Sequence, residues 1–463
     1  MKTFLQSLLD QNKGLDFKSK YQILIYTMFS SILSFSFPYD SILSSSIVLS
    51  IAPTFSSDDA AVSEAYAQPY TETVKRRNLT IDLGNGTTTN AELTIPAEGN
   101  GSFPGVLLIP GSGAVDMNGT GGFILIDNET GSKIYPETQI YFQLAEYLTD
   151  RGFVVLRYDK RGVGSNFTIP DNNVWGNVTF NALKQDAEKA LSLLLEQPEV
   201  NATKGITLIG HSEGTTIAPR VAVDNPDKVK NVVLMAAVAH NLINDLLYFQ
   251  FVETPILYAE KVLDKGHQGV LSIKEASEDP IFQDLGGVII GRILNRTDVP
   301  DDQNKTTPLQ PRGVNTSSDD VMSIQGELKP ELVAAYENLT SPPASALSGK
   351  CLSDVICPLW ARSHIALDST LSMIGNISSS TSVLIMVGEN DSQTPLQQAL
   401  LLQQRLTEVN HPDHLIITYP DLGHVFSSSN EWITDLGPAE EYVLEDIFEW
   451  LASPAREAYE YSH

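Results

Sequence analysis

The sequence predicts an α/β protein with a mostly parallel central sheet flanked by helices and a largely helical insertion. Short continuous apolar runs alternate with helical patterns from about residue 70 onward, as buried strands joined by crossover helices do. The alternation stops after His240 and resumes at Val383. The segment between these residues is therefore expected to leave the sheet and return to it.

Six strands are predicted before this interruption. Alternating apolar residues at 79–83 and 91–95, on either side of Asn85-Gly86, indicate a hairpin. The remaining elements are buried-strand runs at 106–109, 153–156, 206–209 and 232–235, with helices from about Thr138 to Asp150 and around 187–194.

The strand rhythm returns near the C-terminus. Apolar runs at 383–387 and 415–417 predict two more strands. A last helix, with Pro438 near its first turn, places four apolar residues on one face. These residues are Val443, Ile447, Trp450 and Leu451.

The balance of charges excludes one class of partner. The 463 residues include 30 Lys and Arg against 57 Asp and Glu, a formal charge of −27. A surface this acidic repels phosphate backbones, so nucleic acid is not expected as a partner. The length allows one large domain with an insertion, and the acidic residues are interpreted as a solvated surface.

The N-terminal residues are predicted to direct export. Four lysines precede apolar stretches at 23–37 and 42–51, and the small-x-small sequence Ala65-Tyr66-Ala67 precedes Gln68, as signal cleavage requires. Neither stretch reaches the roughly 20 residues that span a bilayer comfortably. Because acidic residues between 58 and 64 separate the apolar runs from this cleavage site, an uncleaved N-terminal membrane anchor stays an alternative. Both alternatives predict a secreted or cell-surface protein.

Asn-x-Ser/Thr sequons support export independently, because chance would convert only a small minority of asparagines in this way. They predict a glycosylated surface. The sequons begin at Asn78, Asn85, Asn100, Asn118, Asn128, Asn166, Asn177, Asn201, Asn295, Asn304, Asn315, Asn338, Asn376 and Asn390.

The chain has two cysteines, Cys351 and Cys357. In an oxidising compartment they are expected to close a short loop, a contribution of about 2 kcal/mol. A zinc site is not expected, because no histidine lies at ligand spacing from them.

The sequence Gly210-His211-Ser212-Glu213-Gly214 lies between the predicted strand at 206–209 and a run compatible with a helix. A nucleophile at a sharp strand-to-helix turn needs glycines on both sides, because larger side chains would collide there. The turn lifts the Ser212 hydroxyl clear of the sheet at a helix N-terminus, where backbone N–H groups favour negative charge. Ser212 is therefore predicted to be a nucleophile.

A serine nucleophile needs a general base, and the base needs a carboxylate that fixes its tautomer. Asp391 follows the strand at 383–387, and His424 follows the strand at 415–417. Both lie past the carboxyl ends of strands, where open α/β sheets bind ligands. We therefore predict a catalytic triad in which His424 is the base for Ser212 and Asp391 orients His424.

Alternatives exist for each of these assignments. Glu389 competes with Asp391 as the acid, and Asp391 by itself would be interpreted as a helix cap. The sequon at Asn390 lies beside the acid and is expected to stay unmodified. The other histidines are poorer bases because they precede a strand, lie around or within the insertion, or end the chain: His411, His414, His240, His267, His364 and His463.

Backbone N–H groups are expected to bind the oxyanion of an acyl-transfer reaction. Pro110-Gly111-Ser112-Gly113 follows the strand at 106–109, where such groups can be exposed. The predicted donors are the N–H groups of Ser112 and Glu213, with Gly113 as the alternative to Ser112. Standing alone, the segment would be interpreted as a plain glycine-rich turn.

Three motifs together resemble the α/β-hydrolase superfamily: RYDKRG at 157–162, PGSG at 110–113 and GHSEG at 210–214. Within it, the likeness is to prokaryotic esterase-like and serine-aminopeptidase-like members, over about 75–240 and 380–455. The resemblance implies an α/β-hydrolase fold, a Ser-His-Asp mechanism, no cofactor, and a lid inserted after the sixth strand.

Two departures weaken the assignment of a substrate. Such relatives often continue PGSG with Pro-x-Asp-Arg-Asp-Gly, where this chain has Ala-Val-Asp-Met-Asn-Gly at 114–119. The relatives' serine after RGxG is Asn166 here, with Ser165 adjacent. Neither position belongs to the triad, so the predicted chemistry is unaffected.

The expected function is hydrolysis of a small-molecule carboxylic ester, with a peptide as an alternative substrate. A serine aminopeptidase would need acidic groups for the substrate amine, such as Glu213, Glu253 or Asp354. An acyltransferase and a catalytically silent surface-binding protein are further alternatives. The predicted parts are an export signal or anchor at 1–67, the first part of an α/β-hydrolase core at 68–240, a lid or cap at 241–380, and the second part of the core at 381–463.

Overall fold

The computed structural model describes residues 73–99, 101–127, 131–166, 168–285, 321–340, 351, 357–429, 432 and 437–453. The segment predicted to direct export lies outside the described residues, as do Asp354, His463 and parts of the predicted insertion. The predicted boundaries of the insertion, at 240 and 380, stay predictions.

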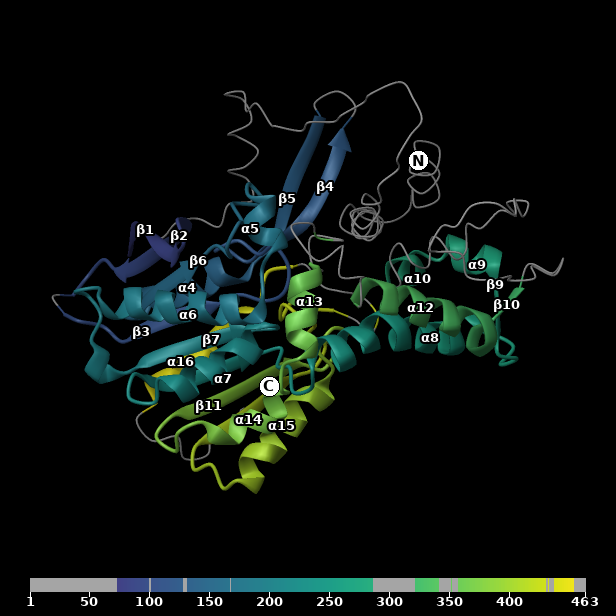
Figure 1. Cartoon of the computed structure of the whole chain (residues 1–463). Helices are drawn as coiled ribbons and strands as arrows, with labels where there is room; N and C mark the ends of the chain where they lie inside the picture. Colours follow the sequence, from purple (N-terminus) through teal and green to yellow (C-terminus); the bar gives the residue numbers. More distant parts are fainter. Residues whose placement is uncertain are drawn as a thin grey trace.

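Eight strands of the described chain form one sheet in the spatial order β1-β2-β6-β3-β7-β8-β11-β12 (Figure 1). The pairs from β6 to β12 are parallel, whereas β2 pairs antiparallel with both β1 and β6. The predicted mostly parallel sheet and its N-terminal hairpin are confirmed. The strands are β1 (Val74–Gly84), β2 (Thr87–Pro96), β3 (Gly105–Ile109), β6 (Val154–Tyr158), β7 (Ile206–His211), β8 (Val229–Met235), β11 (Ser382–Gly388) and β12 (His414–Tyr419).

Helices cover both faces of this sheet. Alternate residues of a strand point to opposite faces, so neighbouring residues of one strand pack against different helices. In β3, Val106 and Leu108 belong to the apolar cluster that contains α4 and α16. Their neighbours Leu107 and Ile109 belong to the cluster that contains α6, α7 and α15. The helices are α4 (Ile140–Asp150), α6 (Phe180–Leu195), α7 (Gly214–Asp224), α15 (Leu396–Glu408) and α16 (Glu441–Ala452).

The sequence analysis expected no element between the third strand and the helix that follows it, but the structure has a hairpin there. Strands β4 (Thr120–Asp127) and β5 (Gly131–Gln139) pair antiparallel and extend away from the main sheet (Figure 1). Because β5 runs to Gln139, α4 begins at Ile140 rather than near Thr138.

Between β8 and β11, the sixth and seventh strands of the sheet, the described residues are mainly helical. Helices α8, α10 and α12 lie together to one side of the sheet, and α13 stands between them and the sheet (Figure 1). None of the described helices is both long and apolar enough to cross a bilayer. The elements are the π-helices η2 (Leu242–Leu247), η3 (Phe249–Glu253), η4 (Ala259–Leu263) and η5 (Ile324–Leu328), the strands β9 (Val270–Ser272) and β10 (Val321–Ser323), and the helices α8 (Thr254–Tyr258), α9 (Ile273–Glu278), α10 (Pro280–Leu285), α12 (Lys329–Thr340), α13 (Pro358–Ile365) and α14 (Thr370–Met373).

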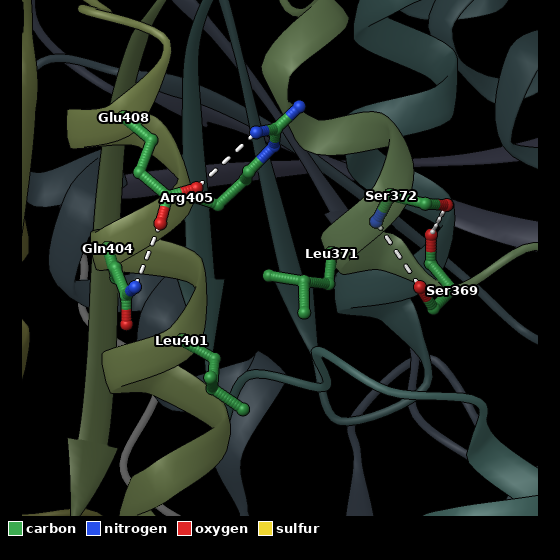
Figure 2. Close-up of a pocket in the computed structure, with 7 residues that line it drawn as sticks. All are labelled: Ser369, Leu371, Ser372, Leu401, Gln404, Arg405 and Glu408. Atoms are coloured by element: carbon green, nitrogen blue, oxygen red, sulfur yellow. Dashed lines mark hydrogen bonds and ion pairs between the residues drawn. The ribbon is translucent and has the colours of Figure 1, made fainter.

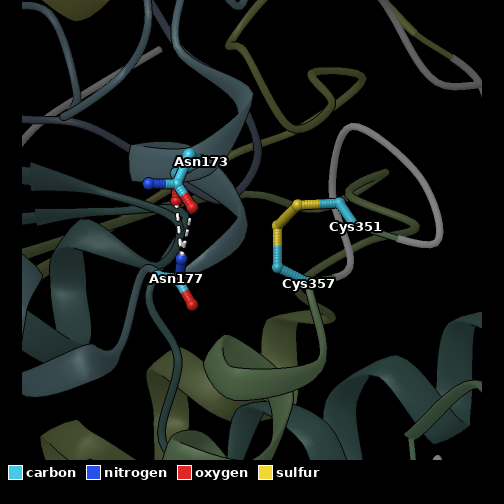
Figure 3. Close-up of a disulfide and its surroundings, with 4 residues drawn as sticks. All are labelled: Asn173, Asn177, Cys351 and Cys357. Carbon is cyan, nitrogen blue, oxygen red and sulfur yellow. Dashed lines mark hydrogen bonds between the residues drawn. A yellow bond between two sulfur atoms is a disulfide. The ribbon is translucent and has the colours of Figure 1, made fainter. Parts of the chain in front are cut away.

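A disulfide joins Cys351 to Cys357, as the sequence analysis expected (Figure 3). Cys357 is fully buried and is the residue immediately before α13. The disulfide therefore closes the loop that leads directly into α13.

Figure 3 also shows Asn177, one of the sequon residues, whose exposed side chain donates a hydrogen bond to the carbonyl oxygen of Asn173 at 2.8 Å.

Candidate active site

Ser212 occupies the sharp turn between β7 and α7. Its φ of 52° is a left-handed conformation, unfavourable for a serine and typical of a strained turn at a functional site. A Cβ on Gly214 would overlap the carbonyl oxygen of Ile109, and a Cβ on Gly210 would overlap that of Gly214. The turn can form only with glycine at both positions, which is the physical reason for the motif.

Asp391 lies three residues beyond the end of β11. Both oxygens of its carboxylate accept hydrogen bonds. Its Oδ1 accepts from the N–H groups of Gln393 and Thr394, at 2.8 and 2.7 Å, and its Oδ2 accepts from the Thr394 hydroxyl at 2.5 Å. Burial alone would raise the pKa of this carboxyl, but His424 and the Thr394 hydrogen bonds outweigh it and lower the pKa. Asp391 is therefore held as a carboxylate.

His424 lies in the loop after β12, with its ring against Asp391. Its Nδ1 donates to Asp391, at 2.9 Å from Oδ2 and 3.1 Å from Oδ1. Its ring centroid lies 4.8 Å from that of His211, the residue before Ser212. A proton on Nδ1 leaves Nε2 as the basic nitrogen of a neutral ring. The structure thus places His424 against Asp391 and beside His211, the residue that precedes Ser212.

His211 connects the loops around this pair. Its Nε2 donates to the carbonyl oxygen of His424 at 2.9 Å, so its Nδ1 is an acceptor and lies 3.4 Å from the Tyr141 hydroxyl. The Tyr141 hydroxyl in turn accepts from the N–H of Gly111 at 2.9 Å. Burial, reinforced by the neighbouring His424, lowers the pKa of His211 to about 3, so its ring stays neutral.

The competing acid and bases lie in unsuitable positions. Glu389 is exposed and accepts a hydrogen bond from the Thr418 hydroxyl at 2.8 Å. His240 contacts Gln398, His364 is buried against Trp360, and the other described histidines contact different groups. Those are His411 and His414, which contact each other at the start of β12, and His267, whose backbone N–H donates to the Asp264 carbonyl.

The two predicted oxyanion donors lie on segments that meet at the nucleophile. A Cβ on Gly111 would lie 3.2 Å from the Cβ of Ser212, which shows how closely the segment 110–113 approaches. Among the described residues, the N–H groups of Ser112 and Glu213 have no hydrogen-bond acceptor. Donors next to the nucleophile without an acceptor are what an oxyanion site requires.

Glu213 was predicted as a backbone donor, with its side chain as one candidate for binding a substrate amine, but its buried contacts were not predicted. Its carboxylate is fully buried, at 0% exposure, and lies 2.8 Å from Lys160 Nζ and 2.5 Å from Trp360 Nε1. Burial would raise its pKa, but the Lys160 ammonium, assisted by His364, lowers it to about 2. Lys160 belongs to the RYDKRG motif, but no role was predicted for its side chain. Its distance from Glu213 along the sequence gave no indication that the two side chains meet.

A surface hollow lies apart from these residues, between the segment around α14 and helix α15 (Figure 2). Its lining includes none of the predicted site residues. Among the described residues, no group of three or more His, Cys, Asp or Glu side chains is arranged to hold a metal ion. The lining residues are Ser369, Leu371, Ser372, Leu401, Gln404, Arg405 and Glu408.

Two family models match parts of the chain. Residues 136–261, which include Ser212, match the model described as serine aminopeptidase, S33. Residues 356–452, which include Asp391 and His424, match the model described as the prolyl oligopeptidase family. The two matches together contain every residue of the predicted triad.

One curated relative is the esterase EstD of Thermotoga maritima, which is 29% identical over 177 residues. The match covers 38% of this chain and 35% of that esterase, so the chain spans about a third of its relative's length. Solved structures with likeness include an α/β hydrolase, GrgF, from Penicillium sp. sh18, at 16% identity and a TM-score of 0.42, covering 81% of this chain and 98% of that one. Another is the proline iminopeptidase of Mycobacterium smegmatis, at 14% identity and a TM-score of 0.44, where the match covers 81% of this chain and 97% of that one. Likeness at this level says nothing about the substrate.

Proposed function

The chain belongs to the α/β-hydrolase superfamily, and on that premise we propose that it is a serine hydrolase that cleaves carboxylic esters. The observation that carries the proposal is the contact between His424 Nδ1 and the buried Asp391 carboxylate. The His424 ring also lies beside the ring of His211, which directly precedes Ser212. A carboxylate on Nδ1 makes Nε2 the basic atom, which a serine nucleophile requires.

The proposed reaction has two stages. His424 takes the proton of Ser212, whose oxygen attacks the ester carbonyl, while the N–H groups of Ser112 and Glu213 bind the oxyanion. His424 then gives the proton to the leaving alcohol, and an acyl-enzyme remains. Water, deprotonated by His424, attacks the acyl group and releases the acid, which restores Ser212.

We propose that the helical residues between β8 and β11 form a lid over this site. Gln250 of η3 donates a hydrogen bond to the carbonyl oxygen of Gln393 at 2.6 Å, and the N–H of Gln393 donates to Asp391. Ser212 is only 9% exposed, so a substrate needs a passage that this part of the chain would shape.

An aminopeptidase is the second candidate, because one matching family model carries that description. It would need a free acidic group for the substrate amine. Glu213 does not fit this role, since its carboxylate is buried and bound by Lys160 and Trp360. Glu253 is already paired with Lys329 at 3.1 Å. These contacts favour the ester over a free N-terminus as substrate.

Hydrolysis of p-nitrophenyl esters from acetate to palmitate, beside aminoacyl-p-nitroanilides, tests the proposal. We expect turnover of esters that Ser212→Ala abolishes while the unfolding midpoint is unchanged, and the optimal chain length would report the size of the acyl pocket. Activity confined to the anilides would favour a peptidase. Silence on both, with Ser212 still labelled by a fluorophosphonate, would favour an acyltransferase; no labelling would favour a binding protein.

We also propose that the protein acts outside the cytoplasm. The N-terminal basic and apolar pattern and the many sequons support this, and several sequon asparagines have exposed side chains. Fractionation of the native host, with immunodetection of the chain, tests the location. A signal confined to the cytoplasmic fraction would reject it.

A further inference from the structure

The two oxyanion-hole segments are joined behind the nucleophile by one buried cation. Lys160 Nζ donates to the carbonyl oxygen of Gly111 at 2.7 Å and to Oε2 of Glu213 at 2.8 Å. Lys160 is 1% exposed and lies 5.5 Å from the centroid of the Trp175 ring. A single ammonium therefore contacts the segment that carries Ser112 and the residue that follows Ser212.

The contact with Gly111 bears directly on the Ser112 donor. The Gly111 carbonyl and the Ser112 N–H belong to one planar peptide unit and point in opposite directions. Holding the carbonyl oxygen therefore fixes the direction in which the Ser112 N–H points. The backbone N–H of Lys160 also donates to the carbonyl oxygen of Val115 at 3.2 Å, which ties Lys160 to the same loop.

The contact with Glu213 acts on the second donor. The carboxylate belongs to the same residue as the N–H group at the start of α7. Its other oxygen, Oε1, accepts from Trp360 Nε1 at 2.5 Å and lies 2.9 Å from Nε2 of His364. Both of these residues belong to α13, so a helix from between β8 and β11 completes the enclosure of this carboxylate.

The charges explain why a cation is needed here. A lone carboxylate beside the nucleophile would oppose the negative charge that develops on the oxyanion. Lys160 neutralises Glu213, and it also lies against the carbonyl end of the Gly111–Ser112 peptide, whose N–H end is the proposed oxyanion donor. A carboxylate at this position is therefore compatible with anion binding only because Lys160 accompanies it.

We propose that Lys160 and Glu213 form a buried positioning pair that sets the separation and direction of the two oxyanion-hole N–H groups, with Trp360 as a further donor to the carboxylate. This rests on the proposed function, because the oxyanion site matters only to an acyl-transfer enzyme. Lys160 touches no substrate atom and acts through the backbone.

The test compares two pairs of substitutions. Lys160→Met/Glu213→Gln removes both buried charges together, so neither is left unpaired. The matched control is Arg161→Met/Asp186→Asn, which removes the adjacent ion pair, at 2.6 Å, without touching either oxyanion segment. The readouts are the rate of Ser212 acylation by a fluorophosphonate, kcat and KM on p-nitrophenyl acetate, and inhibition by phenylboronic acid, which forms a tetrahedral adduct.

We expect the first pair to slow acylation and kcat by about 100-fold, as misplaced catalytic groups do, with KM within about 3-fold of wild type. Phenylboronic acid should bind more weakly by a similar factor, and the control should change each value by less than about 3-fold. Should the first pair fail to fold, Trp360→Phe removes one donor to Glu213 and should slow acylation by up to about 10-fold.

The outcomes separate the two proposals. If the wild type is labelled and Lys160→Met/Glu213→Gln is labelled equally fast, the positioning pair is rejected and the serine hydrolase stands. A rise in the KM of Lys160→Met/Glu213→Gln at unchanged kcat also rejects the positioning pair. Where Trp360→Phe has to be used instead, an unchanged acylation rate in that variant rejects it. If a fluorophosphonate does not label wild-type Ser212, the proposed function fails first, and the inference fails with it.

Discussion

Replacing Asp391 by asparagine is the sharpest test of the proposed triad, because the hydrogen bonds dictate how the new side chain must lie. Oδ1 of Asp391 accepts from two backbone N–H groups, so the amide oxygen must take that place. The amide NH2 then takes the place of Oδ2, facing Nδ1 of His424. His424 can meet this donor only by carrying its own proton on Nε2, and Nε2 is then unable to accept the proton of Ser212.

The expected loss follows from this change of tautomer. Stabilising the wrong tautomer in another serine hydrolase lowers kcat by about 10,000-fold, which corresponds to about 5.4 kcal/mol of transition-state stabilisation. We expect Asp391→Asn to lose about this much in kcat on p-nitrophenyl acetate at pH 7. The unfolding midpoint should change little, because the amide keeps the two backbone hydrogen bonds and the Thr394 hydroxyl can rotate to accept from the new NH2.

Glu389→Gln is the matched control, since it makes the same chemical change two residues earlier on an exposed side chain. It should keep kcat within about 2-fold, as surface substitutions away from a site do. The reasoning would be refuted if Asp391→Asn stayed within tenfold of wild type while folded. It would also be refuted if Glu389→Gln lost as much activity as Asp391→Asn, because Glu389 would then be the acid.

Three further predictions concern stability and modification. The pKa of His211 is about 3 in the folded chain, below the ordinary 6.5, so on acidification the unfolded chain binds a proton that the folded chain does not. The free energy of unfolding should therefore fall as the pH drops below about 6.5, by about 2 kcal/mol at pH 5. Urea denaturation at pH 5 and 7 should show a smaller loss in His211→Gln than in the wild type. Replacing Cys351 and Cys357 together by serine should cost about 2 kcal/mol, and adding a reductant should lower the melting temperature of the wild type but not of this variant. Deglycosylation with an amidase should reduce the mass of protein secreted from a glycosylating host, whereas Asn390→Gln should leave the mass unchanged, because the Asn390 amide donates to Ser429. The sequon residues with exposed side chains are Asn78, Asn85, Asn166, Asn177, Asn338 and Asn376.

The fold was predictable where a local pattern reports burial directly. Strands such as β7 and β11 are buried on both faces, so each is a continuous apolar run that periodicity detects. The hairpin β4–β5 was not predicted, because Gly121, Gly122 and Pro136 interrupt the strand pattern of its segment. The mixed pattern between β8 and β11 likewise predicted helices without their bounds.

The three residues of the predicted triad could be chosen from the sequence because each follows a strand of the parallel sheet, and these strand ends meet at one edge. Asp391 was predicted in preference to Glu389, but spacing supported the choice weakly, since two residues of one short loop can differ mainly in the direction of their side chains. The structure shows Asp391 against His424 and Glu389 against Thr418. Spacing carries no information about that direction.

The side-chain contacts of Glu213 were beyond sequence reasoning for a different reason. Its partners Lys160 and Trp360 lie 53 and 147 residues away along the chain, and only the fold brings them together. A buried acid next to a nucleophile was therefore interpreted as a group that could receive a substrate amine. The structure corrects this, because the carboxylate is already bound on both oxygens.

A buried ion pair of this kind is weak evidence for stability, because removing two charges from water offsets most of their attraction. Replacing such a pair by well-packed hydrophobic side chains of similar volume is often neutral, or stabilising by about 1–4 kcal/mol. We therefore expect the melting temperature of Lys160→Met/Glu213→Gln to be no lower than that of Arg161→Met/Asp186→Asn, although its acylation is much slower. A pair retained for stability alone would show the reverse, a lower melting temperature with unchanged acylation. Its place between the Gly111 carbonyl and the start of α7 gives a physical reason for the first pattern, since the pair holds two oxyanion-hole segments whatever it contributes to stability.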